Sequence, residues 1–143
     1  MRYTTVLALI GAVGAGALLL PRQGSAQNEP VYQVENGRVN QPVYNGYRRY
    51  GDACLRCHGP DGAGSSYAPD LTTSLKTMDF QNFAETVING RKNVTSSAGN
   101  VMPAFGTVED VVLYMNDIYG YLKARSDGKL DRGRPKRVGD DDS

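Results

Sequence analysis

The feature that most constrains this chain is the run Cys54-Leu55-Arg56-Cys57-His58. It holds both cysteines and the single histidine of the 143 residues. Two cysteines cannot build the disulfide framework that stabilises many small exported domains. The fold must therefore use these two thiols, and the imidazole that follows them, in another way.

The spacing C-x-x-C-H is the attachment signature of a c-type haem. Thiols three positions apart near a helix end can each form a thioether with one haem vinyl group. The imidazole of His58 then points at the iron from the proximal side. The sequence therefore predicts one haem c, bound covalently through Cys54 and Cys57.

Two other interpretations of the cysteine pair are weaker. A thioredoxin-like redox pair sits in a βαβ pattern, and none surrounds these residues. A zinc site needs four ligands, and the chain has no further cysteine or histidine. Zinc would then need carboxylates to complete an uncommon structural set.

The first 26 residues have the features of an export signal rather than of a folded element. Arg2 precedes an unbroken apolar run from Val6 to Leu20, which is short for a membrane span of about 20 residues. Gly24 and Ala26 offer the small residues of a cleavage site. We expect cleavage after Ala26, no stable membrane span in the mature protein, and a location in the periplasm. An uncleaved N-terminal anchor is the alternative.

The mature chain divides into three regions. Residues 27–42 are polar and are predicted to form an extended arm, residues 43–125 a folded domain, and residues 126–143 a polar, disordered tail. Within the domain the patterns predict three main helices. The first carries apolar residues at helical spacing before the haem motif, the second spans Phe80–Asn89 after the N-cap Asp79, and the third spans Val108–Arg125.

Three helices are few for a domain of this size, so the apolar core is thin. Such a chain needs a staple or a cofactor to hold one structure, which agrees with a covalent haem. The net charge of +1 argues against a surface for nucleic acid. We expect an all-α monomer in which long loops wrap around the haem.

A sixth iron ligand cannot be a second histidine, because the chain has none. Met78, Met102, Met115, a lysine, a tyrosine or a vacant position remain. Met115 falls on the apolar face of the third helix, and Met78 directly precedes the second helix. Met102 lies in a loop where Pro103 stiffens the chain behind its sulfur, so Met102 is favoured.

Ligation by His58 and Met102 fills both axial positions and raises the reduction potential. This favours electron transfer over oxygen or peroxide chemistry. A haem enzyme or gas sensor with an open sixth position is the second hypothesis, although no other histidine exists to act as a distal base. A third is a subunit fixed in a dehydrogenase or oxidase complex.

Several of these motifs together resemble class I cytochrome c. They are the run Cys54 to Gly62, the run Met102 to Phe105 and a last helix with Tyr119; the resemblance covers Val43 to Arg125.

The resemblance implies an all-α fold in which the first and last helices cross. Gly46 and Tyr47 match the crossing positions of the first helix, and Tyr119 matches the last helix better by register than Tyr121. The resemblance also implies that the Pro69 carbonyl accepts a hydrogen bond from His58 and that Leu71 packs on the porphyrin. Separately, Arg91 is a candidate partner for a haem propionate, since a guanidinium suits a carboxylate.

Four further segments are similar to the methanol-metabolism-related c-type cytochromes. They are residues 32–38, 47–50, 64–69 and 121–128, so the likeness spans nearly the whole mature chain. That family accepts electrons from quinoprotein (PQQ-dependent) methanol and alcohol dehydrogenases, especially the lanthanide-dependent ones. The resemblance implies such a donor, and another cytochrome or a terminal oxidase as the acceptor.

Overall fold

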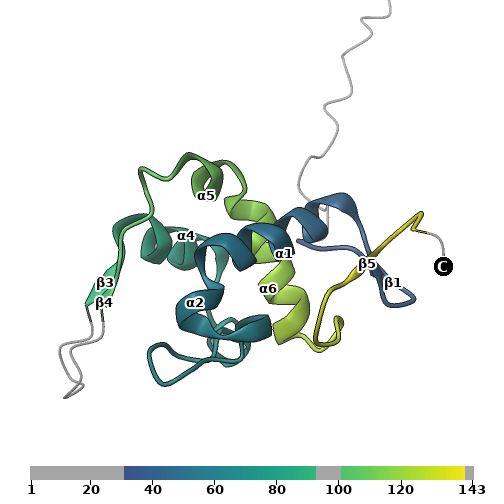
Figure 1. The fold of residues 1–143 in the computed structure, drawn as a ribbon, viewed down its shortest axis with the longest axis horizontal. Helices are drawn as coiled ribbons and strands as arrows, with labels where there is room; N and C mark the ends of the chain where they lie inside the picture. Colours follow the sequence, from purple (N-terminus) through teal and green to yellow (C-terminus); the bar gives the residue numbers. More distant parts are fainter. Residues whose placement is uncertain (1–30, 93–100, 141–143) are drawn as a thin grey trace, which may run out of the picture.

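The computed structural model describes residues 31–92 and 101–140. The signal sequence predicted for residues 1–26 lies outside these ranges. Helices predominate, with short strands at two edges (Figure 1). In chain order the elements are β1 (Val34–Glu35), β2 (Arg38–Val39), α1 (Gln41–Ala53), α2 (Leu55–His58), the 3-10 turn η1 (Pro60–Gly62), α3 (Leu71–Ser74), α4 (Phe80–Asn89), β3 (Arg91–Lys92), β4 (Val101–Met102), α5 (Glu109–Leu113), α6 (Met115–Ser126) and β5 (Lys136–Arg137).

The centre of the fold is the crossing of α1 and α6 (Figure 1). At Gly46 the helices approach so closely that a Cβ atom would overlap the backbone carbonyl of Asp117. Val43 and Tyr50 of α1 and Leu122 of α6 are buried beside the crossing. The predicted crossing of the first and last helices at Gly46 is therefore confirmed.

The aromatic residue that meets Tyr47 across this crossing is Tyr121, so the expectation of Tyr119 is wrong. The Tyr47 and Tyr121 rings are 5.6 Å apart in an edge-on arrangement. Tyr119 instead packs against Phe80 and Phe83 of α4, at 5.4 and 5.3 Å. The reason is helical periodicity: Gly46 touches Asp117, and residues four apart share a helix face.

The helix expected over Val108–Arg125 is two helices, α5 and α6, that meet at Tyr114. The guanidinium of Arg49 lies 4.8 Å from the centre of the Tyr114 ring and 3.3 Å from a carboxylate oxygen of Asp110. These contacts come from α1 and are invisible in the local sequence pattern. The break also leaves Val112 44 % exposed.

Helix α4 forms over the predicted residues. The Asp79 side chain accepts a hydrogen bond from the Asn82 amide at 2.9 Å, as an N-cap does. Gly90 ends the helix with a φ of 71°, a conformation that favours glycine. None of the helices in residues 31–92 and 101–140 is long and apolar enough to cross a membrane.

The predicted extended arm is a hairpin of β1 and β2 that leads into α1. Asn36 and Gly37 have φ values of 50° and 75°, which is the preferred sequence and backbone of a tight hairpin turn. Val39 ends the hairpin fully buried. Asn40 then caps α1, its side chain accepting from the Val43 amide at 3.2 Å.

The expectation of a disordered tail is wrong for residues 127–140. β5 pairs in parallel with β2, and Leu130 is buried at 5 % exposure. The middle of this segment is held by Asp61. The Asp61 carboxylate accepts from the Gly133 amide at 3.0 Å and lies 3.3 Å from Arg132. The segment looks disordered in sequence because its partners are polar and lie some 70 residues away.

Deleting residues 129–143 tests the role of this segment. We expect the free energy of unfolding of the holoprotein to fall by about 3 kcal/mol, because burying one leucine is worth roughly 1.5–3 kcal/mol. Leu130→Ala alone should account for about 2 kcal/mol. Urea titration followed by circular dichroism measures both. An unchanged midpoint in the truncated chain would mean that the tail adds nothing to stability.

Candidate functional site

The two cysteines lie where α1 passes into α2. The Cys54 amide donates to the Tyr50 carbonyl at 2.9 Å, which closes α1, and the His58 amide donates to the Cys54 carbonyl at 2.9 Å, which opens the next turn. Both cysteines are free thiols, with Cys54 half-buried and Cys57 exposed. The motif is thus held rigidly on one helical turn.

Burial raises the pKa of the Cys54 thiol to about 11, and the neighbouring Cys57 adds to the increase. A reactive redox cysteine instead has a lowered pKa, since the thiolate is the nucleophile. The environment of Cys54 therefore argues against a thioredoxin-like pair and suits a sulfur that ends as a neutral thioether.

The imidazole of His58 is buried, with 7 % exposure, and its orientation is set by one contact. Its Nδ1 lies 3.0 Å from the backbone carbonyl oxygen of Pro69, as predicted. A carbonyl only accepts, so Nδ1 carries the proton and Nε2 keeps its lone pair. This is the arrangement by which proteins orient a metal-ligating histidine and raise its basicity.

Two glycines let the chain after His58 fold back tightly enough to bring Pro69 to this position. Gly59 and Gly64 have φ values of 71° and 81°. A Cβ atom at Gly64 would lie 2.7 Å from the Asp70 nitrogen, so no larger residue fits. The Gly64 amide donates to the His58 carbonyl at 2.8 Å, which closes the loop on the histidine.

Tyr50 supports the same loop from the side of α1. Its hydroxyl donates to the Gly59 carbonyl and accepts from the Gly62 amide at 3.0 Å. Burial raises the pKa of Tyr50 to about 12, so the hydroxyl stays protonated and can donate at neutral pH.

Tyr50→Phe should lower the free energy of unfolding by about 2 kcal/mol, because the change leaves two buried backbone groups without their partner. Tyr47→Phe is the matched control, since the Tyr47 hydroxyl makes no hydrogen bond within the described residues. Chemical denaturation of the two holoproteins compares them. Equal losses would show that the hydroxyl contacts of Tyr50 carry no stability.

Met102 lies on a short strand pair that joins the end of α4 to the chain before α5. β3 and β4 are antiparallel, and Arg91 is the direct partner of Met102. Gly90 makes this approach possible, because a Cβ atom there would lie 2.8 Å from the Ala104 nitrogen. The Phe105 amide then donates to the Val87 carbonyl of α4 at 2.9 Å. The loop that carries Met102 is therefore anchored on its α4 side.

The three candidate methionines have different environments. Met115 is buried in the core, as expected from its place on the apolar face of the third helix. Met78 and Met102 are both partly buried and pack against the core. The backbone of Met78 accepts a hydrogen bond from the Tyr119 hydroxyl at 3.2 Å, so its position is tied to α6.

The remaining predicted site residues lie in two places. Leu71 begins α3, directly after the Pro69 loop, and is partly buried against the core. Arg91 is exposed on β3. Directly paired residues of an antiparallel ladder have side chains on the same face, so Arg91 shares the face of Met102, whereas Lys92 pairs with Val101.

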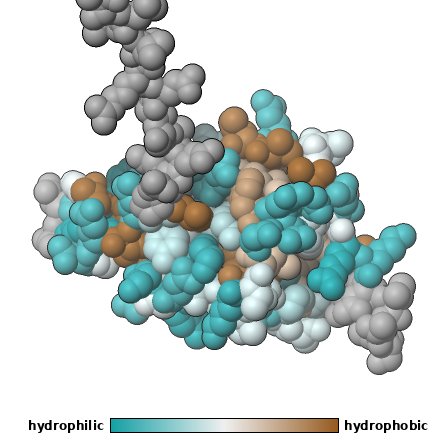
Figure 2. All heavy atoms as spheres, turned by 180° about the vertical axis from the view of Figure 1, so that it is seen from behind, coloured by the Kyte–Doolittle hydropathy of each residue, from teal (hydrophilic) through white to brown (hydrophobic). Residues whose placement is uncertain are grey.

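The described residues suit a covalent haem better than a bare metal ion. Within residues 31–92 and 101–140, no three His, Cys, Asp or Glu side chains gather as a metal site. The donor set is two free thiols, one correctly oriented imidazole and a thioether, which matches haem c. Apolar side chains also reach the surface (Figure 2), among them Tyr67 at 71 % and Val101 at 61 % exposure. A large apolar group would cover such surface favourably.

Two residues that matter here were not predicted from the sequence. The contacts of the Tyr50 hydroxyl to Gly59 and Gly62 depend on the loop geometry. Asp61 was quoted only within the motif. Asp61 has a φ of 60° and a buried carboxylate. That carboxylate connects the loop after His58 to the C-terminal segment, residues 127–140.

Comparisons with known proteins agree with this geometry. Residues 41–115 match the family model described as cytochrome c oxidase, cbb3-type, subunit III. Cytochrome c-555 of Methylococcus capsulatus is 35% identical over 135 residues, which cover 93% of this chain and 89% of that protein. Cytochrome c-553I of Paracoccus denitrificans is 47% identical over 114 residues, or 79% of this chain. The aligned part is 50% of that relative, so this chain spans about half its length.

A solved structure shows the same fold. The crystal structure of the c-type cytochrome XoxG from Methylobacterium extorquens AM1 is 37% identical, with a TM-score of 0.64. The match covers 81% of this chain and 77% of that one. The chain belongs to the class I c-type cytochromes, small electron carriers rather than enzymes, with one haem c attached covalently to Cys54 and Cys57.

Proposed function

We propose that this cytochrome carries single electrons with iron bound between His58 and Met102. The observation that carries the proposal is the contact of the His58 Nδ1 with the Pro69 carbonyl at 3.0 Å, which leaves Nε2 free for the iron. The bound haem supplies a one-electron couple between ferrous and ferric iron. The chain would hold the iron through His58 and Met102, so little rearrangement would accompany each transfer.

The surroundings of the haem are proposed from the same elements. Leu71 packs on the porphyrin, and Arg91 pairs with a propionate. The support for Arg91 is that it lies on the face of Met102 in the β3–β4 ladder. Arg91→Gln should therefore lower the reduction potential more than Lys92→Gln, because it leaves a propionate uncompensated. Spectroelectrochemical titration of both variants compares them, and equal shifts would contradict the role of Arg91.

Electrons enter and leave at the edge of the haem near Cys57, which is the exposed member of the pair. We propose a PQQ-dependent methanol or alcohol dehydrogenase as the donor, and another cytochrome or a terminal oxidase as the acceptor. The support is the likeness to the methanol-metabolism-related cytochromes in residues 32–38, 47–50, 64–69 and 121–128.

Stopped-flow spectroscopy tests the donor. The oxidised holocytochrome is mixed with a candidate quinoprotein dehydrogenase and its alcohol, and the haem absorbance reports reduction. Saturable reduction that requires both the enzyme and the alcohol is expected. If no quinoprotein dehydrogenase reduces the haem, the donor is of another class, while the electron-carrier role is untouched.

The protein is further proposed to work as a monomer in the periplasm after removal of residues 1–26. Gel filtration of a native periplasmic extract should show the haem absorbance at the mass of a single small chain. Elution with a dehydrogenase or oxidase would instead identify a fixed subunit. N-terminal sequencing of the same fraction should begin at Gln27.

A further inference from the structure

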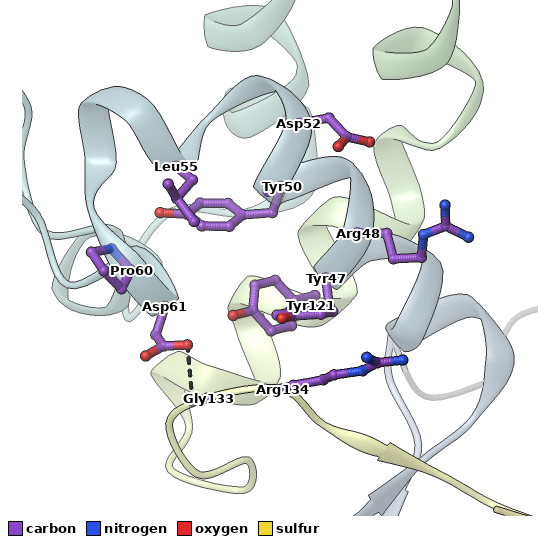
Figure 3. A pocket seen from close by; sticks show the side chains of 11 residues that line it. Tyr47, Arg48, Tyr50, Asp52, Leu55, Pro60, Asp61, Tyr121, Gly133 and Arg134 are labelled. Carbon is purple, nitrogen blue, oxygen red and sulfur yellow. Dashed lines mark hydrogen bonds between the residues drawn. The ribbon is translucent and has the colours of Figure 1, made fainter.

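A cavity of about 330 Å³ lies between α1, the turn after His58 that contains Pro60 and Asp61, and the C-terminal segment at Gly133 and Arg134. Figure 3 shows its lining: aromatic rings from α1 and α6, Leu55 of the motif, Pro60 after it, and charged side chains around the edge. The volume is within the range of roughly 300–1,000 Å³ of small-molecule sites in proteins. It lies outside the set of residues proposed to bind the haem.

The two carboxylates of this cavity are already neutralised from outside it. Asp52 lies 3.3 Å from Arg49. Asp61 lies 3.3 Å from Arg132 and accepts from the Gly133 amide at 3.0 Å, the contact dashed in Figure 3. Neither Arg49 nor Arg132 lines the cavity. Each carboxylate is therefore ion-paired with an arginine outside the cavity, although Arg49 is shared with Asp110 and the charge of Asp61 still acts on Tyr121.

The two arginines of the cavity, in contrast, have no carboxylate partner. Arg134 donates to the neutral Tyr44 hydroxyl, at 2.6 Å from Nη2. Arg48 makes no hydrogen bond or ion pair within the described ranges. Both guanidiniums extend toward the same side of the cavity (Figure 3). The uncompensated charge of the lining is thus positive and gathered on one side.

One residue that lines the cavity, Tyr121, also carries an unsatisfied polar group. The Tyr121 hydroxyl is buried and has no hydrogen-bond partner among the described residues. Burial, and secondly the charge of Asp61, raise the pKa of Tyr121 well above its usual value, so the hydroxyl is a donor at neutral pH. A buried polar group without a partner is rare in folded proteins.

We propose that this cavity binds a small aromatic carboxylate. The partly exposed ring of Tyr47 lines the cavity beside the buried Tyr50 and Tyr121, and an aromatic lining favours a planar body. The guanidiniums of Arg48 and Arg134 supply charge-assisted hydrogen bonds for the carboxylate. The Tyr121 hydroxyl donates to an acceptor on the ring.

The test is a titration of the holocytochrome with 4-hydroxybenzoate, whose phenol oxygen is such an acceptor. Calorimetry measures the affinity, and ¹⁵N chemical shifts of the reduced protein report the site. For a ligand of ten heavy atoms we expect a Kd on the order of 1 mM, with shifts at Gly51 and Gly133. 4-Hydroxybenzamide has the same shape without the charge and should bind more weakly.

Two variants and one control assign the contacts. Arg48→Gln should weaken binding about tenfold, as loss of a charge-assisted hydrogen bond does. Tyr121→Phe should weaken it about fivefold without loss of folding, because it removes an unsatisfied hydroxyl. Arg56→Gln removes an exposed arginine of α2 outside the cavity and should leave the affinity unchanged.

The proposal is overturned by an absence of saturable binding or by shifts that fall elsewhere. It is also overturned if the amide binds as tightly as the carboxylate, or if Arg48→Gln and Arg56→Gln have equal effects. Unchanged affinity in Tyr121→Phe would mean that only water meets this hydroxyl, which contradicts the proposed contact.

Discussion

Met102→Ala should convert the cytochrome into a protein that binds carbon monoxide readily in its reduced form. In the proposed wild-type site the Met102 sulfur holds the sixth position, so the added ligand must displace it. The reduction potential should fall by on the order of 0.1–0.3 V, within the roughly 0.8 V that axial ligands span. A thioether stabilises the ferrous state, and water in its place does not. Carbon monoxide titration and a potentiometric titration measure the two effects.

Met78→Ala is the matched control, because Met78 is also partly buried against the core. Its potential and its resistance to carbon monoxide should equal those of the wild type. If the wild type binds carbon monoxide as fast as Met102→Ala, Met102 is not a ligand, and a haem enzyme or gas sensor with an open site becomes the better description. If only Met78→Ala changes, Met78 is the sixth ligand.

Gly46→Ala should lower the free energy of unfolding by about 3 kcal/mol, at the upper end for overpacking a core. A Cβ atom at this position overlaps the backbone carbonyl of Asp117. A helix backbone cannot move aside as a side-chain tip can, so α1 and α6 must separate. Their separation also loosens the contacts that bury Tyr50 and Leu122. Urea denaturation of the holoprotein gives the free energy.

The same helix offers a control of the same chemistry. Gly51 is exposed, and a Cβ atom there would have nothing within 4 Å. Gly51→Ala should therefore stabilise the protein by about 0.5–1 kcal/mol, since alanine loses less conformational freedom in a helix than glycine. Destabilisation of similar size at both positions would show that close packing at Gly46 is not the cause.

Much of the site could be predicted because its chemistry is local in sequence. Cys54, Cys57 and His58 share one helical turn, and the distance along the chain to Pro69 is short. Asp79 and Gly90 mark the ends of α4 by caps that need only neighbouring residues. The approach at Gly46 was predictable since only glycine permits two helix backbones to touch.

The features that were missed depend on contacts between distant residues. At the break between α5 and α6, Tyr114 contacts Arg49 on another helix. The order of residues 127–140 follows from Asp61 and from the pairing of β5 with β2. Tyr119 and Tyr121 point about 200° apart around a helix, so choosing Tyr121 required knowing which face of α6 meets α1. A polar segment and a disordered one look alike when the partners are far along the chain.

The parallel pairing of β2 with β5 also constrains the order in which the parts of the chain can fold. Arg38 pairs with Lys136, and α1 finds its main partner in α6, so both ends of the domain must be present before either is covered. A chain that emerges N-terminus first holds Cys54 and Cys57 in the open until its last residues arrive. Contacts of such long sequence separation form slowly. The topology thus leaves an interval in which α1 and the haem motif are not yet covered by α6.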